Sequence, residues 1–155
     1  MLNHPTYERL THLRLFGMVQ ALTEQARTPD LQALTFEERL GLLVDREITE
    51  RQNRQIRNRL RQARLKQAAV AEDIDYRHPR GLDRAVVRRL LAGDWVRAHQ
   101  NVLVTGPTGV GKTYLACALA NAACRQGHTA LYQRLPRWFE ELALARADGR
   151  YLKLM

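Results

Sequence analysis

A glycine-rich loop at residues 106–113 constrains this chain more than any other feature. It reads Gly-Pro-Thr-Gly-Val-Gly-Lys-Thr, which matches the pattern G-x-x-x-x-G-K-[ST] (Walker A) at every fixed position. Glycines leave backbone N–H groups free to surround phosphate oxygens, the lysine supplies positive charge to the β- and γ-phosphates, and the last hydroxyl is a ligand for Mg²⁺. The motif therefore predicts a site for a nucleoside triphosphate.

The sequence on either side of the loop predicts the strand and the helix that this motif requires. Residues 101–105 form a short, apolar and β-branched run, which is typical of a buried strand. Residues 114–126 are rich in Ala and Leu and contain neither Gly nor Pro, so they predict a helix that Gly127 ends. A second strand is expected at residues 129–133. The helix N-terminus would present free N–H groups and its positive dipole end to the phosphates.

The candidate nucleotide site is the loop together with the residue that follows it. Lys112 is expected to bind the β- and γ-phosphates, and the hydroxyl of Thr113 is expected to bind Mg²⁺. The expected cofactor-binding residues are Gly106, Pro107, Thr108, Gly109, Val110, Gly111, Lys112, Thr113 and Tyr114. The alternative is a glycine-rich turn without a ligand, and the specificity of the motif argues against it.

The sequence supports nucleotide binding better than hydrolysis. Hydrolysis by this class of loop normally uses a second motif, an apolar strand ending in an acid that holds Mg²⁺ and orients water. The only acids after Thr113 are Glu140, Glu141 and Asp148. The first two fall on a predicted helix, and the third precedes a glycine in a turn. No catalytic residue and no arginine finger is therefore assigned.

The N-terminal half is expected to be helical and strongly basic. Apolar residues recur at helical spacing in residues 5–27, and Thr35 and Glu38 form a capping box for a second helix that extends to about residue 71. Seven arginines and lysines, and no acid, lie between residues 51 and 71, in a chain of net charge +9. A one-signed run of arginines favours a polyanionic partner, because phosphates would relieve the repulsion and counterions would be released.

Five arginines of this basic run are the candidate DNA contacts. They are Arg51, Arg54, Arg57, Arg61 and Arg64, and the last four are spaced by three, four and three residues, so they line one face of the predicted helix. No aromatic residue interleaves them. Contact with the phosphate backbone, with little reading of base sequence, is therefore expected. The alternative is a solvated basic face on a structural helix.

Composition predicts no transmembrane helix and gives the cysteines no redox or metal role. No stretch approaches 18 consecutive apolar residues, and the first residues lack the pattern of a signal peptide, so a cytoplasmic protein is expected. The two cysteines, Cys117 and Cys124, lie seven residues apart on the helix after the loop. Small buried apolar positions are the favoured interpretation of both.

An ordered set of short segments runs along nearly the whole chain and matches one family. The segments are Leu13–Met18, Glu37–Leu40 with Leu42 and Leu43, the arginine-rich run, Asp73–Tyr76, Gly81–Arg84, Asn101–Leu103 with the glycine loop, Leu115 with Ala116, and Ala145–Gly149. In this order they resemble the IstB-like ATPases, helper proteins of bacterial insertion-sequence transposition in the AAA+ superfamily. Tyr114 stands where many members have His. Helicase loaders of bacterial replication are similar across the ATPase part and are the alternative.

The resemblance implies an α/β fold in three parts. Residues 1–71 would form a helical region that binds DNA and a partner, residues 72–81 a linker, and residues 82–155 an incomplete P-loop domain with a parallel AAA+ sheet. It also implies ATP and Mg²⁺ as cofactors, a transposase as partner, and self-assembly into homo-oligomers on DNA when the chain is full length.

Members of the family are longer than this chain. The additional part carries the second acidic motif and the arginine finger, and it holds the strands that would pair with residues 101–105. We therefore expect a truncated helper protein that binds ATP and DNA without hydrolysing ATP alone, and whether it is an enzyme stays open. A helicase-loader-like ATPase and a non-enzymatic DNA-binding remnant are the alternatives.

Overall fold

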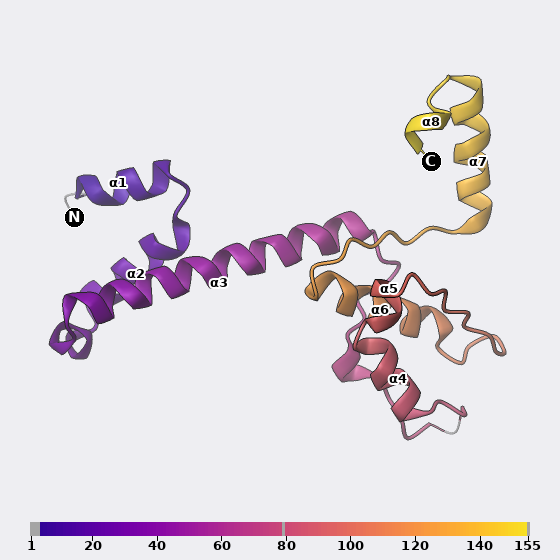
Figure 1. Cartoon of the computed structure of the whole chain (residues 1–155), viewed down its shortest axis with the longest axis horizontal. Coiled ribbons are helices and arrows are strands. Elements are labelled where there is room, and N and C mark those ends of the chain that lie inside the picture. Colours follow the sequence, from indigo (N-terminus) through magenta and orange to yellow (C-terminus); the bar gives the residue numbers. More distant parts are fainter. Residues whose placement is uncertain (1–3, 79, 155) are drawn as a thin grey trace. The chain divides into compact units, whose positions relative to one another are not determined.

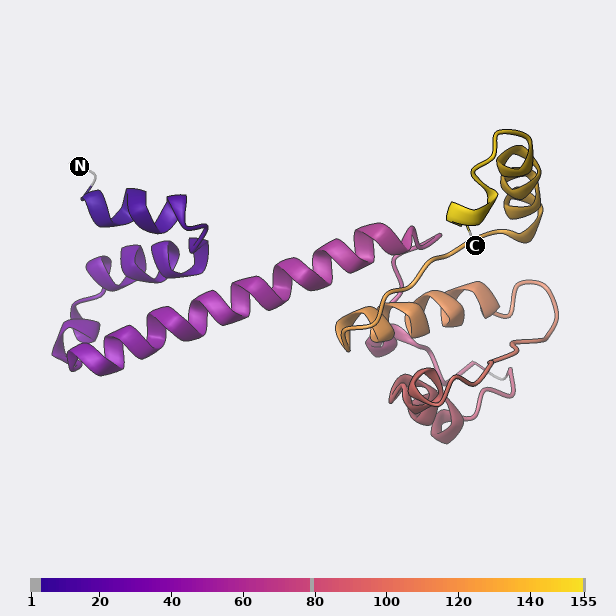
Figure 2. The same ribbon diagram turned by 45° about the horizontal axis from the view of Figure 1, so that its top comes forward.

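The chain is built from helices joined by irregular segments (Figures 1 and 2). A computed structural model describes residues 4–78 and 80–154. Two compact units divide the chain, Met1–Arg57 (unit 1) and Asn58–Met155 (unit 2), and their boundary falls within helix α3. In the part of the chain that the structure describes, no helix is both long enough and apolar enough to cross a bilayer.

Within residues 4–78 and 80–154, the helices follow one another along the sequence without an intervening sheet. Unit 1 holds α1 (Pro5–His12), α2 (Phe16–Arg27), the 3-10 helix η1 (Pro29–Ala33) and most of α3 (Phe36–Ala63). Unit 2 holds the end of α3, the 3-10 helix η2 (Ala71–Asp73), α4 (Arg84–Leu91), α5 (Asp94–Arg97), α6 (Lys112–Arg125), α7 (Leu135–Ala147) and α8 (Tyr151–Leu154).

Helix α3 begins as the sequence predicts and ends earlier. The predicted capping box is confirmed: the N–H of Thr35 donates to Glu38 Oε2 (2.8 Å), and the N–H of Glu38 donates to Thr35 Oγ1 (3.3 Å). The helix stops at Ala63, whereas helical character was expected to about residue 71. Arg64 adopts a left-handed backbone conformation, with a φ of 49°, and this conformation ends an α-helix.

Unit 1 is held by a close contact between α2 and α3. A Cβ atom added to Gly17 would lie 2.7 Å from the carbonyl oxygen of Arg46 and from Cα of Glu47, so only glycine fits. The side chain of Glu47, which is 6% exposed, reaches the start of α2, where its Oε2 accepts the N–H of Gly17 (2.7 Å) and of Met18 (3.3 Å). The two helices thus share a glycine contact and a buried carboxylate.

Unit 2 has a small core around helix α6. Its buried members are Ala69, Ile74, Val87, Cys117 and Ala118. Cys117 and Cys124 are free and fully buried, which confirms the prediction that they are small core residues. Burial raises the pKa of the Cys124 thiol. Ile74 comes from the segment 72–81, so this segment contributes to the core, and the predicted domain limits at 1–71 and 82–155 stay a prediction.

The described residues contain no β-strand, so the predicted parallel-sheet α/β domain is wrong. Residues 101–105 and 129–133 are irregular. A strand exists only when a neighbour accepts and donates its backbone hydrogen bonds in a regular ladder. Among the described residues no such ladder forms, and the one backbone bond from residues 129–133 to a distant segment joins the N–H of Tyr132 to the carbonyl oxygen of Ala63. Leu103 is accordingly 89% exposed and Leu131 60% exposed. The apolar pattern predicted strands, but a strand also needs a neighbouring strand to pair with, and the pattern contains no information about that neighbour.

Candidate functional site

The glycine loop adopts the backbone conformation that its composition suggests. Gly106, Gly109 and Gly111 have φ values of 146°, 87° and 94°, a region that favours glycine. An added Cβ at Gly109 would meet nothing within 4 Å, so glycine is favoured there by the positive φ and not by lack of space. Helix α6 begins at Lys112, directly after the loop, and no side chain in the described part of the chain caps its first turn. Free N–H groups at a helix N-terminus attract anions.

Lys112 lies over the loop, held by two of its carbonyl groups. Its Nζ donates to the carbonyl oxygens of Gly106 (2.7 Å) and Pro107 (2.6 Å). Both contacts are hydrogen bonds from a cation to a neutral acceptor. A phosphate oxygen would add its own negative charge to the interaction with the ammonium, so the arrangement fits an anionic ligand.

Arg80 supports the loop, although sequence reasoning missed it. Nη1 of Arg80 donates to the carbonyl oxygen of Val110 (3.2 Å), and a Cβ added to Gly111 would lie 2.8 Å from this nitrogen. The other terminal nitrogen donates to the carbonyl oxygen of Asp75. The buried Nε has no hydrogen-bond partner among the described residues. Arg80 lies thirty residues before Val110 in an apparent linker, where no motif marks it.

A cavity of about 150 Å³ opens beside the loop. Its lining combines part of the candidate site with apolar residues from earlier in the chain: Ile74, Arg80, Gly81, Leu82, Val104, Thr105, Val110, Gly111, Lys112, Tyr114 and Leu115. The other candidate residues lie outside this lining: Gly106, Pro107, Thr108, Gly109 and Thr113. Ligand pockets typically measure about 300–1,000 Å³, so the cavity would take one portion of a nucleotide.

The last two residues of the candidate site belong to the first turn of α6. Thr113 is half-buried there, and its hydroxyl is the one Mg²⁺ ligand that the motif supplies. The hydroxyl of Tyr114 donates to the carbonyl oxygen of Val70 at the long distance of 3.4 Å. Tyr114 also packs against the core of unit 2. Its side chain therefore has a structural contact in addition to lining the cavity.

The structure shows that the candidate DNA contacts in unit 1 already have partners. Arg51 Nε donates to the buried Glu47 Oε1 (2.7 Å), and Arg57 Nη2 donates to Glu50 Oε1 (2.8 Å). The guanidinium of Arg54 lies over the ring of Phe16, 5.1 Å from its centroid. The side chains of Arg51 and Arg57 remain 56% and 62% exposed. A DNA phosphate that contacts one of these arginines would have to share the guanidinium with its present partner or displace that partner.

The two remaining arginines lie in unit 2 and differ from each other. Arg61 is exposed on the last turns of α3, and its Nη2 donates to Asn58 Oδ1 (3.2 Å). Arg64 follows the helix end and lines a second cavity with Lys66. The regular three-and-four spacing therefore does not place Arg64 on the face of α3, because the helix stops before it.

Comparison with known proteins identifies the family of this phosphate-loop protein. Residues 8–155 match the family described as IstB-like ATP binding protein. The chain belongs to this family, which favours the IstB resemblance over the helicase-loader alternative. The family match covers unit 2 and nearly all of unit 1.

Individual relatives extend beyond this chain. A candidate insertion sequence ATP-binding protein of Sinorhizobium fredii is 50% identical over 154 residues, which are 99% of this chain and 63% of the relative. A similarly named protein of Pseudomonas fluorescens is 49% identical over 97% of this chain and 66% of its own length. One of Pseudomonas aeruginosa is 37% identical over 92% of this chain and 52% of its own length. The chain spans roughly half to two-thirds of these relatives.

Proposed function

We propose that this chain is an ATP-binding and DNA-binding helper protein of insertion-sequence transposition. The observation that carries the proposal is the glycine loop at the open N-terminus of α6, with Lys112 held over it. The relatives are named insertion sequence ATP-binding proteins, which supports the same function. The exposed loop leaves the first-turn N–H groups of α6 accessible to a triphosphate.

ATP would be bound mainly through its phosphates. The N–H groups from Gly109 to Thr113 would donate to phosphate oxygens, and Lys112 would exchange its two carbonyl contacts for the β- and γ-phosphates. Thr113 would hold Mg²⁺, which neutralises phosphate charge when bound. Arg80 would keep the loop in place through the carbonyl of Val110.

We propose that this chain holds ATP without hydrolysing it by itself. Two of the acids that follow the loop are already paired with arginines. Arg137 Nε donates to Glu141 Oε1 (3.1 Å), and Arg150 Nε donates to Asp148 Oδ2 (2.7 Å). Glu140 is exposed on α7. None of the three lines the cavity beside the loop, so none is in position to orient a water at the γ-phosphate.

DNA and a transposase would be the macromolecular partners. The exposed guanidinium groups of Arg57 and Arg61 support contact with a phosphate backbone, and Arg51, Arg54 and Arg64 are the other proposed contacts. Such contacts weaken with salt and read little base sequence. We further propose that the full-length protein assembles into homo-oligomers on DNA. A transposase partner follows from the association of the relatives with insertion sequences.

The test is the affinity of the intact chain for a fluorescent ATP analogue. Lys112→Ala should weaken binding by about 100-fold, because the variant loses a charge-assisted contact with the phosphates. Arg89→Ala is the matched control, since it removes one positive charge from an exposed position on α4. Equal affinity in Lys112→Ala and Arg89→Ala would refute a nucleotide site at the loop.

A further inference from the structure

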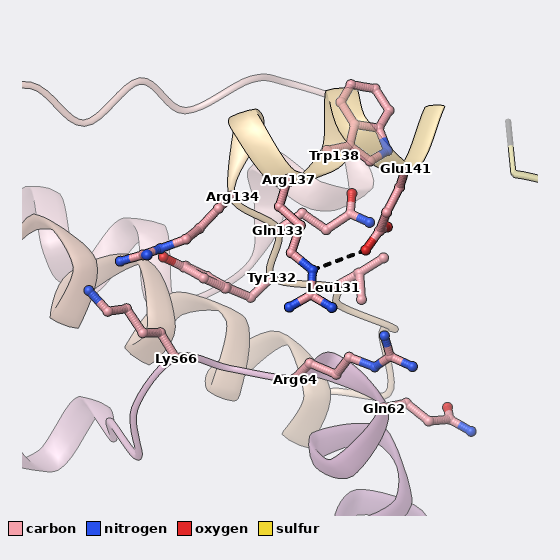
Figure 3. A pocket seen from close by; sticks show the side chains of 10 residues that line it. All are labelled: Gln62, Arg64, Lys66, Leu131, Tyr132, Gln133, Arg134, Arg137, Trp138 and Glu141. Atoms are coloured by element: carbon pink, nitrogen blue, oxygen red, sulfur yellow. Dashed lines mark hydrogen bonds and ion pairs between the residues drawn. The ribbon is translucent and has the colours of Figure 1, made fainter. Parts of the chain in front are cut away.

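A second, larger cavity lies in unit 2, where the segment after α3 meets the start of α7. Its volume is about 520 Å³. Figure 3 shows side chains from two stretches of the chain on opposite sides of it, residues 62–66 and residues 131–141. One backbone hydrogen bond joins the two stretches, from the N–H of Tyr132 to the carbonyl oxygen of Ala63 (2.8 Å).

The cavity is lined mainly by positive charge. Four basic side chains face one acid, which is Glu141, and this acid is paired with Arg137 at 3.1 Å. Within the part of the chain that the structure describes, no ion pair involves Arg64, Lys66 or Arg134. Three uncompensated cations around one cavity repel each other, so an anion bound among them would lower the energy of the site.

The local backbone places these cations together. Arg64 is left-handed (φ 49°), which turns the chain at the end of α3 and brings Arg64 and Lys66 to one side of the cavity. On the other side, Arg134 stands immediately before α7, a helix of 13 residues whose N-terminus none of the described side chains caps. The positive end of the α7 dipole therefore adds to the charge of Arg134.

Two aromatic residues, Tyr132 and Trp138, line the same cavity. Both are half-buried, so part of each ring remains accessible. Proteins that bind single-stranded nucleic acid combine a basic groove, which holds the backbone, with aromatic rings on which bases stack. The basic run of α3 contains no aromatic residue of its own. The contact between the two stretches brings Arg64 and Lys66 of the basic run to the same cavity as Tyr132 and Trp138.

We propose that this cavity binds an unpaired nucleotide of a nucleic-acid single strand. Arg64, Lys66 and Arg134 hold its phosphates, and Trp138 stacks against its base. The volume lies within the range of about 300–1,000 Å³ that small ligands fill, which suits a single nucleotide and not a base-paired duplex. The inference extends the proposed DNA contact to a site separate from the ATP loop, with which it shares no residue.

The test measures binding of a labelled thymidine oligonucleotide of about 12 nucleotides by fluorescence anisotropy, because single-strand sites of about 4–16 nucleotides are common. The intact chain is compared with Arg134→Ala, Trp138→Ala and the control Arg89→Ala. Trp138→Ala should weaken binding about fivefold or more, as the loss of one stacked base does. Arg134→Ala should lower the slope of log affinity against log salt by about 0.7, which corresponds to one single-strand phosphate contact. Arg89→Ala should change neither value.

Wild-type affinity in both cavity variants would overturn the proposal. So would a duplex that binds as tightly as the single strand and is unaffected by Trp138→Ala. A third arm adds ATP to the wild type and to Lys112→Ala. If ATP displaces the oligonucleotide equally from both proteins, the cavity accepts free nucleotides, and the proposal that it binds a single strand is overturned. Arg134 is exposed, so its variant tests the site even if Trp138→Ala fails to fold.

The same variants separate this inference from the proposed function. Lys112→Ala should lose ATP and keep the oligonucleotide, whereas Arg134→Ala should keep ATP and bind the oligonucleotide with a reduced salt dependence. Failure of the first result concerns the glycine loop alone. Failure of the second concerns only the cavity between residues 62–66 and 131–141.

Discussion

The N-termini of helices α2 and α6 differ in what binds their first backbone N–H groups. Helix α2 starts beside Gly17, and its first N–H groups donate to a carboxylate of the chain itself, that of Glu47. Helix α6 starts after Gly111, and among the described residues no side chain accepts from its first turn. At both ends the helix itself supplies no acceptor for its first N–H groups, and the positive end of the dipole lies there. The carboxylate of Glu47 completes the first, and we propose that an external anion binds at the second.

The carboxylate of Glu47 is held in its ionised form by its hydrogen bonds. Burial raises the pKa of Glu47, but the hydrogen bonds from Arg51, Met18 and Gly17 together outweigh it, so the pKa lies below its ordinary value. Ionised Glu47 thus joins the start of α2 to α3 and holds Arg51. The loop at α6 has the opposite character, because it is exposed and Lys112 contacts only its neutral carbonyls.

The largest effect is expected where the two helices of unit 1 touch. Gly17→Ala should destabilise unit 1 by about 3 kcal/mol, because the new methyl group would overlap the backbone of Arg46 and Glu47. Gly41→Ala is the matched control on α3, since an added Cβ there meets nothing within 4 Å. It should stabilise by roughly 0.5–1 kcal/mol.

Denaturant unfolding followed by circular dichroism measures both glycine variants. The chain has two tryptophans, Trp95 and Trp138, and both lie in unit 2, so their fluorescence reports that unit. Loss of helical signal in Gly17→Ala should precede the change in tryptophan fluorescence. Equal stability of Gly17→Ala and Gly41→Ala would show that the close contact contributes nothing.

Removing the internal anion should have the next largest effect. Glu47→Gln should destabilise unit 1 by about 2 kcal/mol, because hydrogen bonds to a charged group contribute roughly 1.5–3 kcal/mol. Glu24→Gln is the control: Glu24 pairs with Arg46 at 3.4 Å, but its side chain is 62% exposed, so a change within about 1 kcal/mol is expected. Unfolding curves that do not differ between the two variants would contradict the role of Glu47.

Acid should weaken the same contact. Since the folded pKa of Glu47 is depressed, its stabilisation is present above the ordinary value of 4.5 and is lost as the pH falls through the folded pKa. The difference in unfolding free energy between wild type and Glu47→Gln should therefore shrink from about pH 6 to about pH 3. A difference that stays constant over this range would contradict an ionised Glu47 at the start of α2.

The smallest expected effect concerns the support of the open helix end. Arg80→Ala should weaken ATP binding severalfold, about 1 kcal/mol, because one hydrogen bond to the loop carbonyl of Val110 is lost. Arg77→Ala removes the same type of side chain three residues earlier and should leave the affinity unchanged. Titration of the fluorescent ATP analogue compares the two, and an equal effect would remove Arg80 from the site.

Local features could be predicted from the sequence because they depend on neighbouring residues. The capping box of Thr35 and Glu38 involves residues three apart, and the structure confirms it. The helix after the glycine loop was also expected, and α6 lies there. The burial of Cys117 followed from residue type. These features need no information about distant parts of the chain.

The features that failed or were missed depend on distant partners. Residues 101–105 have the composition of a strand, but the described residues provide no neighbour to pair with them. Glu47 meets Gly17 across thirty positions, and Arg80 meets Val110 across the same separation. No short motif encodes either contact. The cavity between residues 62–66 and 131–141 was equally hidden, because its two halves are far apart in sequence.

Amide hydrogen exchange, measured with and without ATP and Mg²⁺, tests the central claim most directly. The N–H groups of Gly17 and Met18 should exchange slowly in both conditions, because Glu47 already binds them. The N–H groups from Gly109 to Thr113 should exchange fast without nucleotide and slowly with it, and Lys112→Ala should abolish that protection. Exchange at Gly109–Thr113 that ATP leaves unchanged in the wild type would contradict the account.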